Sequence, residues 1–276
     1  MEKIDRLGWA AGISIKSYGV SVGIRTNDAS LLDALVERLP PEWRPARSSV
    51  VERLYSVFMG GRAARSNVRR FNLLYGDLER LVRSQDAEHV YDALESDLQL
   101  YVAERAQRRV FIHAGVVGWK GRAILIPGKS FSGKSTLTRE LIRAGALFYS
   151  DEYAVLDARG RVHPFHRPLQ LRDHETARQT KHTVESLGGE RGTRPLPVGL
   201  VLLSEYKRDA RWRPQRLSAG QGALAMMLHA VSARRQPEAV LETLRHVVTS
   251  AAVMKVKRGE AAEAVDDILK LLSWKA

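Results

Sequence analysis

The sequence predicts an α/β protein in two parts: a small α+β module, residues 1–107, and a mixed sheet with flanking helices, residues 108–276. Alternating apolar residues near the amino terminus predict a hairpin, and apolar residues spaced by three and four predict a long helix before residue 108. The pattern then changes to an apolar strand, a glycine-rich loop and a helix, followed by further strands and helices. A chain of 276 residues is long enough for a small and a medium domain.

The amino-terminal module begins with a predicted hairpin. Apolar residues alternate from Ile13 to Ile24 on both sides of a Tyr-Gly turn, as in two strands with one buried face. Ser30 and Asp33 resemble a capping box that starts a helix, and Pro40 ends that helix. The other predicted elements of this module are strands at 50–58 and 71–74 and an amphipathic helix at 86–108.

The second part alternates predicted strands and helices. Lys120-Gly121 separates two short apolar runs and predicts a hairpin or bend, and Gly145 ends a helix pattern that starts at Lys134. Residues 188–197 are rich in Gly, Pro and Arg and predict a mobile surface loop. The predicted strands are 110–117, 123–126, 146–149, 198–203 and 252–256, and the predicted helices are 134–144, 220–231, 237–250 and 260–272.

Composition excludes several classes of protein. Hydrophobic residues make up 44% of the chain and charged residues 27%, which is typical of a folded protein with a core. There is no cysteine, so disulfides, thiolate metal sites and cysteine nucleophiles are excluded. The amino terminus shows neither a secretory signal nor a membrane span, and we expect a cytoplasmic protein without membrane association.

The net charge of +13 attracts polyanions. Nucleic acid, an acidic protein or peptide, and a phosphorylated metabolite all fit such a surface, and so does an ordinary arginine-rich surface with no partner. Basic clusters lie at 62–70, 105–109, 207–216 and 234–235.

The glycine-rich loop predicts a nucleoside triphosphate site. It reads Gly128-Lys129-Ser130-Phe131-Ser132-Gly133-Lys134-Ser135-Thr136 and meets the spacing G-x-x-x-x-G-K-S. In such a loop the backbone amides face the phosphates, the lysine neutralises phosphate oxygens, and the hydroxyl after it binds Mg²⁺. Because an apolar strand precedes the loop and a helix follows it, a chance Gly/Ser turn is the less favoured interpretation.

Asp151 and Glu152 follow a predicted strand and provide the acidic groups that phosphoryl transfer needs. A strand that returns after the loop and helix ends near the phosphates, where a carboxylate can take a substrate proton or hold the metal. The alternative is an ordinary surface turn. His113, in the strand before the loop, is by itself more typical of a hydrogen-bonded core histidine than of a catalytic one.

These segments together resemble the catalytic domain of HPr serine kinase/phosphorylases and their HprK-like relatives. The matching runs are His113-Ala-Gly-Val-Val117, Gly121, Ile124-Leu-Ile-Pro-Gly128, Ser132-Gly-Lys-Ser-Thr136 and Ser150-Asp-Glu152, within residues 108–175. The resemblance implies that Asp151 is the base toward the acceptor hydroxyl, that His113 assists near the γ-phosphate, and that Ser135 binds Mg²⁺. It also implies ATP as donor, and family members assemble as homo-oligomers.

The chain departs from that family at several positions. Lys129 stands where the family has an acid, and Phe131 where it has glycine, which makes the loop harder to curl. Leu169-Gln170-Leu171-Arg172 resembles a Leu-Glu-Ile-Arg segment but lacks the carboxylate that reaches Mg²⁺, so Glu152 is the candidate replacement. Arg172 is a candidate phosphate contact or a surface ion-pair partner. The family's HPr-recognition signature is absent from the sequence.

Three functions fit these observations. The first is a kinase that moves the γ-phosphate of ATP to a hydroxyl, such as serine of a peptide or protein, or a small molecule. The second is a regulatory nucleotide-binding module without catalysis. The third is a nucleic-acid-linked ATPase or kinase, suggested by the basic charge and by Arg211-Trp212-Arg213, where an aromatic residue lies between cations.

Overall fold

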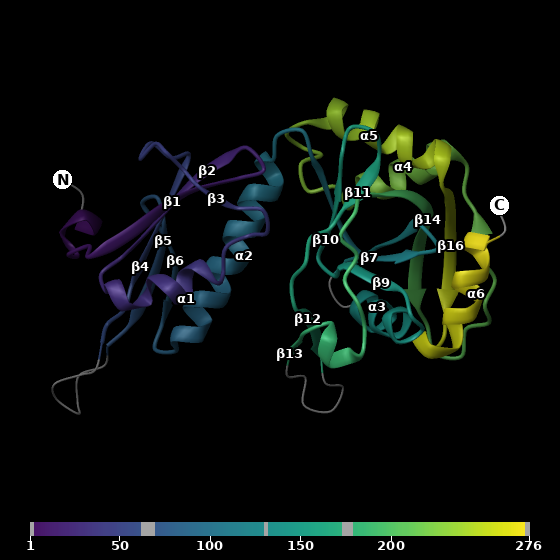
Figure 1. Ribbon diagram of the computed structural model, residues 1–276, viewed down its shortest axis with the longest axis horizontal. Coiled ribbons are helices and arrows are strands. Elements are labelled where there is room, and N and C mark those ends of the chain that lie inside the picture. Colours follow the sequence, from purple (N-terminus) through teal and green to yellow (C-terminus); the bar gives the residue numbers. More distant parts are fainter. Residues whose placement is uncertain (1–2, 62–69, 130–131, 173–178, 274–276) are drawn as a thin grey trace. The chain divides into compact units, whose positions relative to one another are not determined.

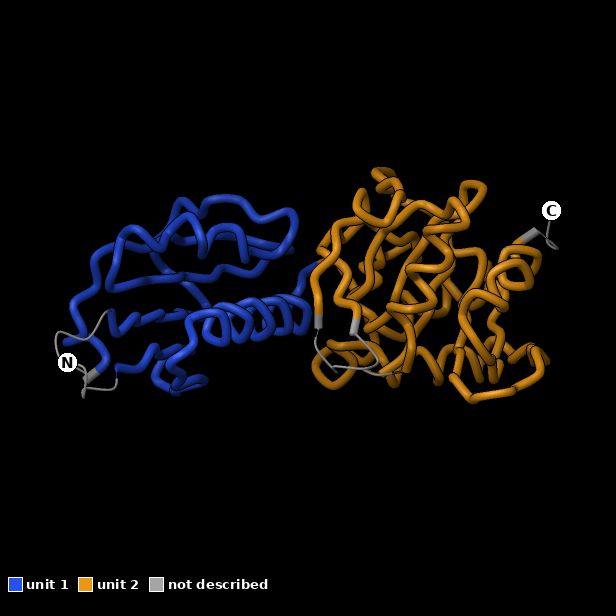
Figure 2. The backbone as a smooth tube through the Cα atoms, turned by 90° about the horizontal axis from the view of Figure 1, so that it is seen from below, with its two compact units in different colours: residues 1–107 blue, residues 108–276 orange. Residues whose placement is uncertain are grey.

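The computed structural model of the chain describes residues 3–61, 70–129, 132–172 and 179–273 (Figure 1). The chain divides into two compact units, residues 1–107 and 108–276 (Figure 2). Both units combine helices with mixed sheets, so the predicted α/β class is confirmed. Among the helices in these described ranges, none has the length and apolar character that crossing a membrane requires.

Unit 1 is built on a six-stranded sheet in the order β3-β1-β2-β4-β5-β6. The predicted hairpin is confirmed: β1 and β2 are antiparallel, with Ile13 opposite Ile24. Its turn residues, Tyr18 and Gly19, have φ of 47° and 91°, as a two-residue hairpin turn requires. The strands are β1 Ala11–Ser17, β2 Val20–Thr26, β3 Arg44–Pro45, β4 Arg53–Phe58, β5 Asn72–Gly76 and β6 Glu79–Ser84.

The long helix of unit 1, α2 (Ala87–Arg105), buries one face against the sheet. Asp86 caps it by accepting a hydrogen bond from the amide of Glu88. Leu94 and Leu98 on the helix pack with Tyr55 of β4, and all three side chains are fully buried. The periodicity of apolar residues therefore predicted this helix correctly.

The predicted Ser30–Asp33 capping box is wrong. Asp28 is the capping residue and accepts hydrogen bonds from both the amide and the hydroxyl of Ser30. This cap lies two residues earlier than predicted, and the segment starts as a 3₁₀ turn, η2 (Ala29–Leu31), and continues as the short helix α1 (Leu32–Val36). A first 3₁₀ turn, η1, spans Lys3–Arg6.

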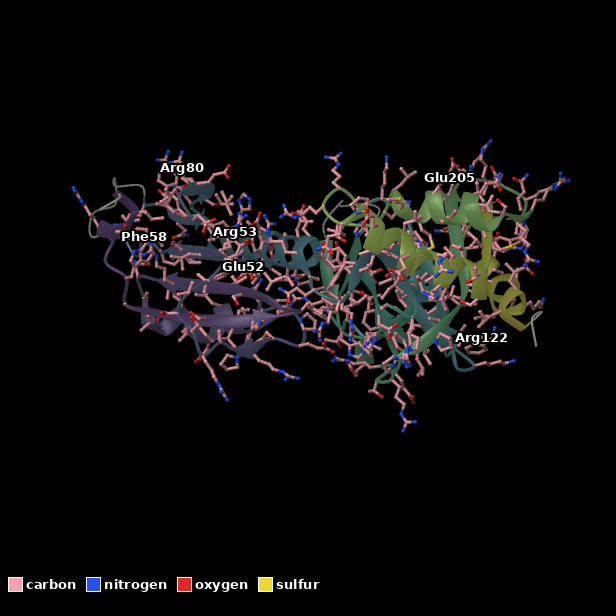
Figure 3. The ribbon with its side chains drawn as sticks, turned by 90° about the horizontal axis from the view of Figure 1, so that it is seen from above. Glu52, Arg53, Phe58, Arg80, Arg122 and Glu205 are labelled. Carbon is pink, nitrogen blue, oxygen red and sulfur yellow. The ribbon has the colours of Figure 1, made fainter. Side chains whose placement is uncertain are left out.

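Unit 2 contains an eight-stranded mixed sheet, with β7-β8-β14-β16 at its centre. β8, β14 and β16 are parallel to one another, so their carboxyl ends lie at one edge. Figure 3 labels Arg122 at the start of β8 and Glu205 near the end of β14. The strands are β7 Val110–Trp119, β8 Arg122–Pro127, β9 Leu147–Ser150, β10 Tyr153–Leu156, β11 Arg161–His163, β14 Leu196–Tyr206, β15 Gln215–Arg216 and β16 Ala252–Arg258.

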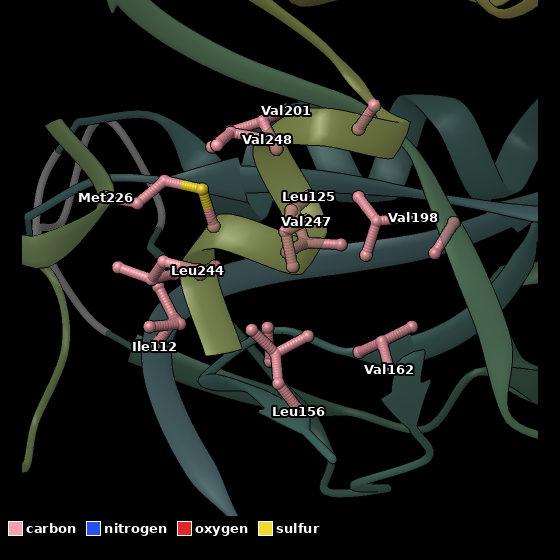
Figure 4. Close-up of a cluster of buried hydrophobic side chains, with 14 of the residues drawn as sticks. Ile112, Leu125, Leu156, Val162, Val198, Val201, Met226, Leu244, Val247 and Val248 are labelled. Atoms are coloured by element: carbon pink, nitrogen blue, oxygen red, sulfur yellow. The ribbon is translucent and has the colours of Figure 1, made fainter. Parts of the chain in front are cut away.

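Helices cover both faces of this sheet. On one face, α4 (Ala219–Met227) and α5 (Pro237–Ser250) bury side chains such as Met226 and Leu244 against Leu125 and Val201 (Figure 4). On the other face, Leu137 of α3 and Ile268 of α6 pack with Ile124 and Ile126. Successive side chains of β8 therefore point to opposite faces of the sheet and pack into two different cores. The elements on this second face are α3 Lys134–Arg143, α6 Ala261–Ser273, β12 Leu169–Arg172, β13 Gln179–His182 and η3 Glu185–Leu187.

The segment 188–197, which the composition predicts to be a mobile surface loop, is largely exposed and is hydrogen-bonded to β9. The amide of Phe148 in β9 donates to the carbonyl of Glu190, and the amide of Gly192 donates to the carbonyl of Phe148. Gly192 also lies so close to the Tyr149 ring that a Cβ there would clash. The glycines therefore serve close packing against β9, and a composition-based interpretation cannot distinguish packing from flexibility.

Candidate active site

The phosphate loop starts where β8 ends and closes where α3 begins. The amide of Gly128 donates to the carbonyl of His113 in β7, at 3.3 Å, which ties the start of the loop to the neighbouring strand. A Cβ on Gly128 would lie 2.5 Å from Oγ of Ser132 and 3.2 Å from the Lys134 stem. Glycine at this position leaves room for the Ser132 hydroxyl and the Lys134 side chain. Ser130 and Phe131 lie outside the described residues.

Gly133 makes the transition from the loop to α3. It is the N-cap residue with φ of 80°, a left-handed conformation that glycine adopts without strain. Gly133 has no side chain with which to cap the amides of the first turn, which includes Ser135 and Thr136. Uncapped amides and the positive end of the helix dipole favour an anion at this end of α3.

Lys134 is buried, with 7% of its surface exposed, and its ammonium group points back over the loop. Nζ donates to the carbonyl of Lys129 at 3.0 Å and lies 3.5 Å from Nε2 of His113. Burial lowers the pKa of Lys134, whereas the charges of Asp151 and Glu152 raise it. These carboxylates therefore face the same space as the loop lysine.

Asp151 and Glu152 directly follow the end of β9, as the sequence predicts, and form a two-residue bend before β10. Both β9 and β10 pair antiparallel with β7, with Ser150 opposite Val116 and Tyr153 opposite His113. The two acidic residues fall between these pairs. The Ser150 hydroxyl accepts hydrogen bonds from the amides of Glu152 and Tyr153 and fixes the local bend.

The Asp151 side chain is 9% exposed and lies next to the first turns of α3. Burial raises its pKa to about 7, and the Ser135 hydroxyl and the charge of Lys134 partly oppose that increase. Gly115 makes this proximity possible, because a Cβ there would collide with the Thr138 hydroxyl of α3. A carboxyl group with a pKa near neutrality can exchange protons at physiological pH.

Three buried polar atoms around the loop have no hydrogen-bond partner of good geometry among the described residues: Ser132 Oγ, Thr138 Oγ1 and Asp151 Oδ1. The Thr138 hydroxyl is nevertheless close enough to Asp151 to lower the pKa of its carboxyl. Leaving buried polar atoms unpaired is unfavourable, so such a cluster indicates a ligand or water that pairs with them. All three atoms are oxygens, and oxygen is the ligand atom that Mg²⁺ prefers. The two hydroxyls can also donate hydrogen bonds to phosphate oxygens or to water. The residues present therefore fit a magnesium–polyphosphate group.

The described part of unit 2 offers no group of three His, Asp or Glu side chains that could enclose a metal ion. Mg²⁺ in nucleotide sites uses one or two carboxylates, a hydroxyl, water and the phosphates themselves. Asp151, Ser135 and Glu152 are the candidate protein ligands.

His113 is neutral and links Lys134 to Glu152. Burial, followed by the nearby charge of Lys134, lowers its pKa to about 4. Nδ1 lies 3.0 Å from the carbonyl oxygen of Glu152, so Nδ1 carries the proton and Nε2 is left to accept from Lys134. The ring is thus placed to orient the lysine rather than to supply a proton.

Two residues that the sequence did not single out also lie at the loop. His229, after α4, accepts a hydrogen bond from the His113 amide at its carbonyl, and its pKa is lowered by burial and by Lys134 and Lys129. Arg258, at the end of β16, donates to the carbonyl of Gly133. Both residues are distant in sequence, and no local motif marks them.

The segment that contains Arg172, the candidate phosphate contact, forms β12, which pairs with β13. Leu169 and Leu171 of this strand pack into the core that includes α3. Gln170 is exposed. The Arg172 side chain lies outside the described residues.

The positive charge belongs to the unit that contains the loop. Unit 2 has 29 Lys and Arg residues and 16 Asp and Glu residues, whereas unit 1 has 15 of each. The whole net charge of +13 therefore lies in residues 108–276. Such a field favours a polyanionic ligand.

No protein-family model matches the sequence, and no curated protein matches it significantly. The resemblance to HPr kinases therefore remains a prediction from the motifs.

Proposed function

We propose that the chain is an HprK-like phosphotransferase that moves the γ-phosphate of ATP to a hydroxyl group. The observation that carries this proposal is the shared space of Lys134, at the start of α3, and the buried Asp151 carboxyl, whose charges act on each other. A cation at an anion site and a carboxyl with a pKa near 7 are the two groups that phosphoryl transfer to a hydroxyl needs.

The nucleotide phosphates would bind the loop amides of residues 128–133 and the first turn of α3, with Lys134 neutralising their charge. Ser135 and Glu152 would hold Mg²⁺. When bound, Mg²⁺ acts as a Lewis acid that stabilises negative charge on the phosphate oxygens. Ser132 and Thr138 would give their unpaired hydroxyls to phosphate or to metal-bound water.

Asp151 would act as the general base. The proton of the acceptor hydroxyl passes to the Asp151 carboxylate, and the acceptor oxygen forms a bond to the γ-phosphorus. The bond from that phosphorus to the β–γ bridging oxygen breaks, and ADP leaves with the electron pair. His113 would hold the Lys134 ammonium in place, because Nε2 faces Nζ and Nδ1 faces the carbonyl of Glu152.

The acceptor class is a hydroxyl compound, with serine of a peptide or protein and a small hydroxyl metabolite as the two members to test first. The fold that this proposal implies is the HPr-kinase-like phosphate-loop fold. The family's assembly as a homo-oligomer belongs to the same proposal.

The test is incubation of purified protein with γ-labelled ATP and Mg²⁺, together with serine, serine-containing peptides or no acceptor. We expect label transfer by the wild type, none by Lys134→Ala, and wild-type transfer by Lys255→Ala, which removes an exposed lysine of β16. Nucleotide binding without turnover under any condition would contradict catalysis, and turnover only with added nucleic acid would favour a nucleic-acid-linked ATPase.

A further inference from the structure

Arg258 ends β16 and is buried, with 2% of its surface exposed. β16 lies two strands from β8 in the central sheet, and both strands run in the same direction through β14. The carboxyl end of β16 therefore faces the same sheet edge as the phosphate loop. Arg258 and the loop residue Gly133 are 125 residues apart in the sequence.

The Arg258 guanidinium is fixed between the loop and its own strand. Nη2 donates to the carbonyl of Gly133 at 3.0 Å, and Nη1 donates to the carbonyl of Gly259 at 3.0 Å. The guanidinium carbon lies 5.8 Å from the centre of the Tyr206 ring. Nε is buried and has no partner among the described residues.

The Gly133 carbonyl also accepts the first hydrogen bond of α3, from the amide of Leu137 at 3.1 Å. Two donors therefore fix the orientation of the peptide unit between Gly133 and Lys134. A Cβ on Gly133 would lie 2.7 Å from Nη2 of Arg258, so this glycine serves the close approach of the arginine as well as the left-handed φ.

The charge on Arg258 has no ion-pair partner among the residues that the structure describes. No carboxylate lies within ion-pair distance of it in the described residues, and Glu260 acts on it only at longer range. Arginine does not lose its proton in proteins, so the cation stays buried at the edge of the loop. A buried, unpaired cation is unfavourable by itself and becomes favourable when an anion binds nearby.

We propose that Arg258 is a positioning residue of the phosphate loop: it holds the Gly133 carbonyl so that the following amides face a bound polyphosphate, and its charge strengthens that site. This inference rests on the proposed nucleotide site. It assigns the orientation of the Gly133 carbonyl to a residue outside the loop motif.

The test measures binding of inorganic tripolyphosphate and of ATP by calorimetry to wild type, Arg258→Met, Arg258→Lys and Lys257→Met. Lys257→Met is the matched control, because it removes one positive charge from the neighbouring, exposed position of the same strand. We expect Arg258→Met to bind both ligands ~10–100-fold more weakly, as for the loss of a charged hydrogen bond. We expect Lys257→Met to stay within about twofold of wild type, as for one screened surface charge.

Two further measurements separate positioning from simple folding. Added guanidinium ion, at concentrations far below those that unfold proteins, should restore part of the binding to Arg258→Met and leave Lys257→Met unchanged. Arg258→Lys keeps the charge but loses the planar fork, so we expect binding between that of wild type and Arg258→Met. If Arg258→Met does not fold, Arg258→Lys alone decides the proposal.

Wild-type binding by both Arg258 variants would overturn the role of Arg258 and leave the proposed function intact. Equal losses in Arg258→Met and Lys257→Met would also overturn it, because a general loss of positive charge would then explain the effect. Failure of the wild type to bind either ligand would overturn the proposed function itself.

Discussion

Nε2 of His113 lies 3.5 Å from Nζ of Lys134, while Nδ1 of the same ring faces the carbonyl of Glu152. The neutral imidazole thereby joins the loop lysine to the acidic segment between β9 and β10. A charged imidazole could not accept from the ammonium group, and burial together with Lys134 keeps the His113 pKa low, at about 4. The link therefore persists through the physiological pH range.

We expect His113→Leu to raise the KM for ATP by ~10-fold, since one hydrogen bond to a charged group is lost, with a smaller effect on kcat. Glutamine has both an acceptor and a donor, so His113→Gln should stay close to wild type. Steady-state kinetics of the two variants is the measurement. A large loss of kcat in His113→Gln would show that the imidazole itself takes part in proton transfer.

Asp151→Asn should reduce phosphate transfer by ~10²–10⁴-fold while nucleotide binding stays within a few-fold of wild type. The amide keeps the size of the side chain but cannot accept the proton of the acceptor hydroxyl. Single-turnover transfer and calorimetric binding of ATP separate the two effects. Full activity of this variant would remove Asp151 from the mechanism.

The pH dependence of kcat/KM should show a rise with a midpoint near pH 7 in the wild type. Burial raises the Asp151 pKa to about 7, and only the ionised carboxylate acts as a base, so the rate increases as pH rises through that value. Profiles recorded from pH 5 to 9 with saturating Mg²⁺ test this expectation. The pH profile of the residual kcat/KM of Asp151→Asn should lack the midpoint near pH 7.

The sequence predicted the phosphate loop because its determinants are local: a strand, glycines at fixed spacing, and a helix. It also predicted α2 and α5, whose apolar periodicity or flanking residues are readable within one segment. It also predicted that Asp151 directly follows a strand. It did not predict that β10 continues along β7 after a two-residue bend, since that pairing involves a strand distant in sequence. Arg258 was not found for the same reason, because only the order of the parallel strands brings it to Gly133.

Burial of the Asp151 carboxylate should cost stability in the nucleotide-free protein. Its pKa in the folded state exceeds the unfolded value, so the folded state binds more protons between about pH 4 and 7 and loses that advantage as pH rises. Asp151→Asn lacks this cost. The unfolding free energy of Asp151→Asn minus that of the wild type should therefore be larger at pH 8 than at pH 5. We expect this difference to increase by about 1–3 kcal/mol between the two pH values.

The test is thermal unfolding of both proteins at the two pH values, detected with a spectroscopic probe in unit 2. A constant difference between Asp151→Asn and wild type at pH 5 and pH 8 would contradict the raised pKa. It would also remove the basis of the expected pH–rate profile.

Gly115 and Thr138 provide a test of how β7 and α3 are joined beside Asp151. A Cβ at position 115 would collide with the Thr138 hydroxyl, whereas the Thr138 Cβ is 3.8 Å away, an ordinary contact. Gly115→Ala alone should destabilise the protein by about 1–3 kcal/mol, as for overpacking of a core. Thr138→Ala removes the clashing oxygen, so the double variant should recover most of that loss. A double-mutant cycle of unfolding free energies measures the coupling, and strict additivity would show that α3 does not approach β7 through this contact.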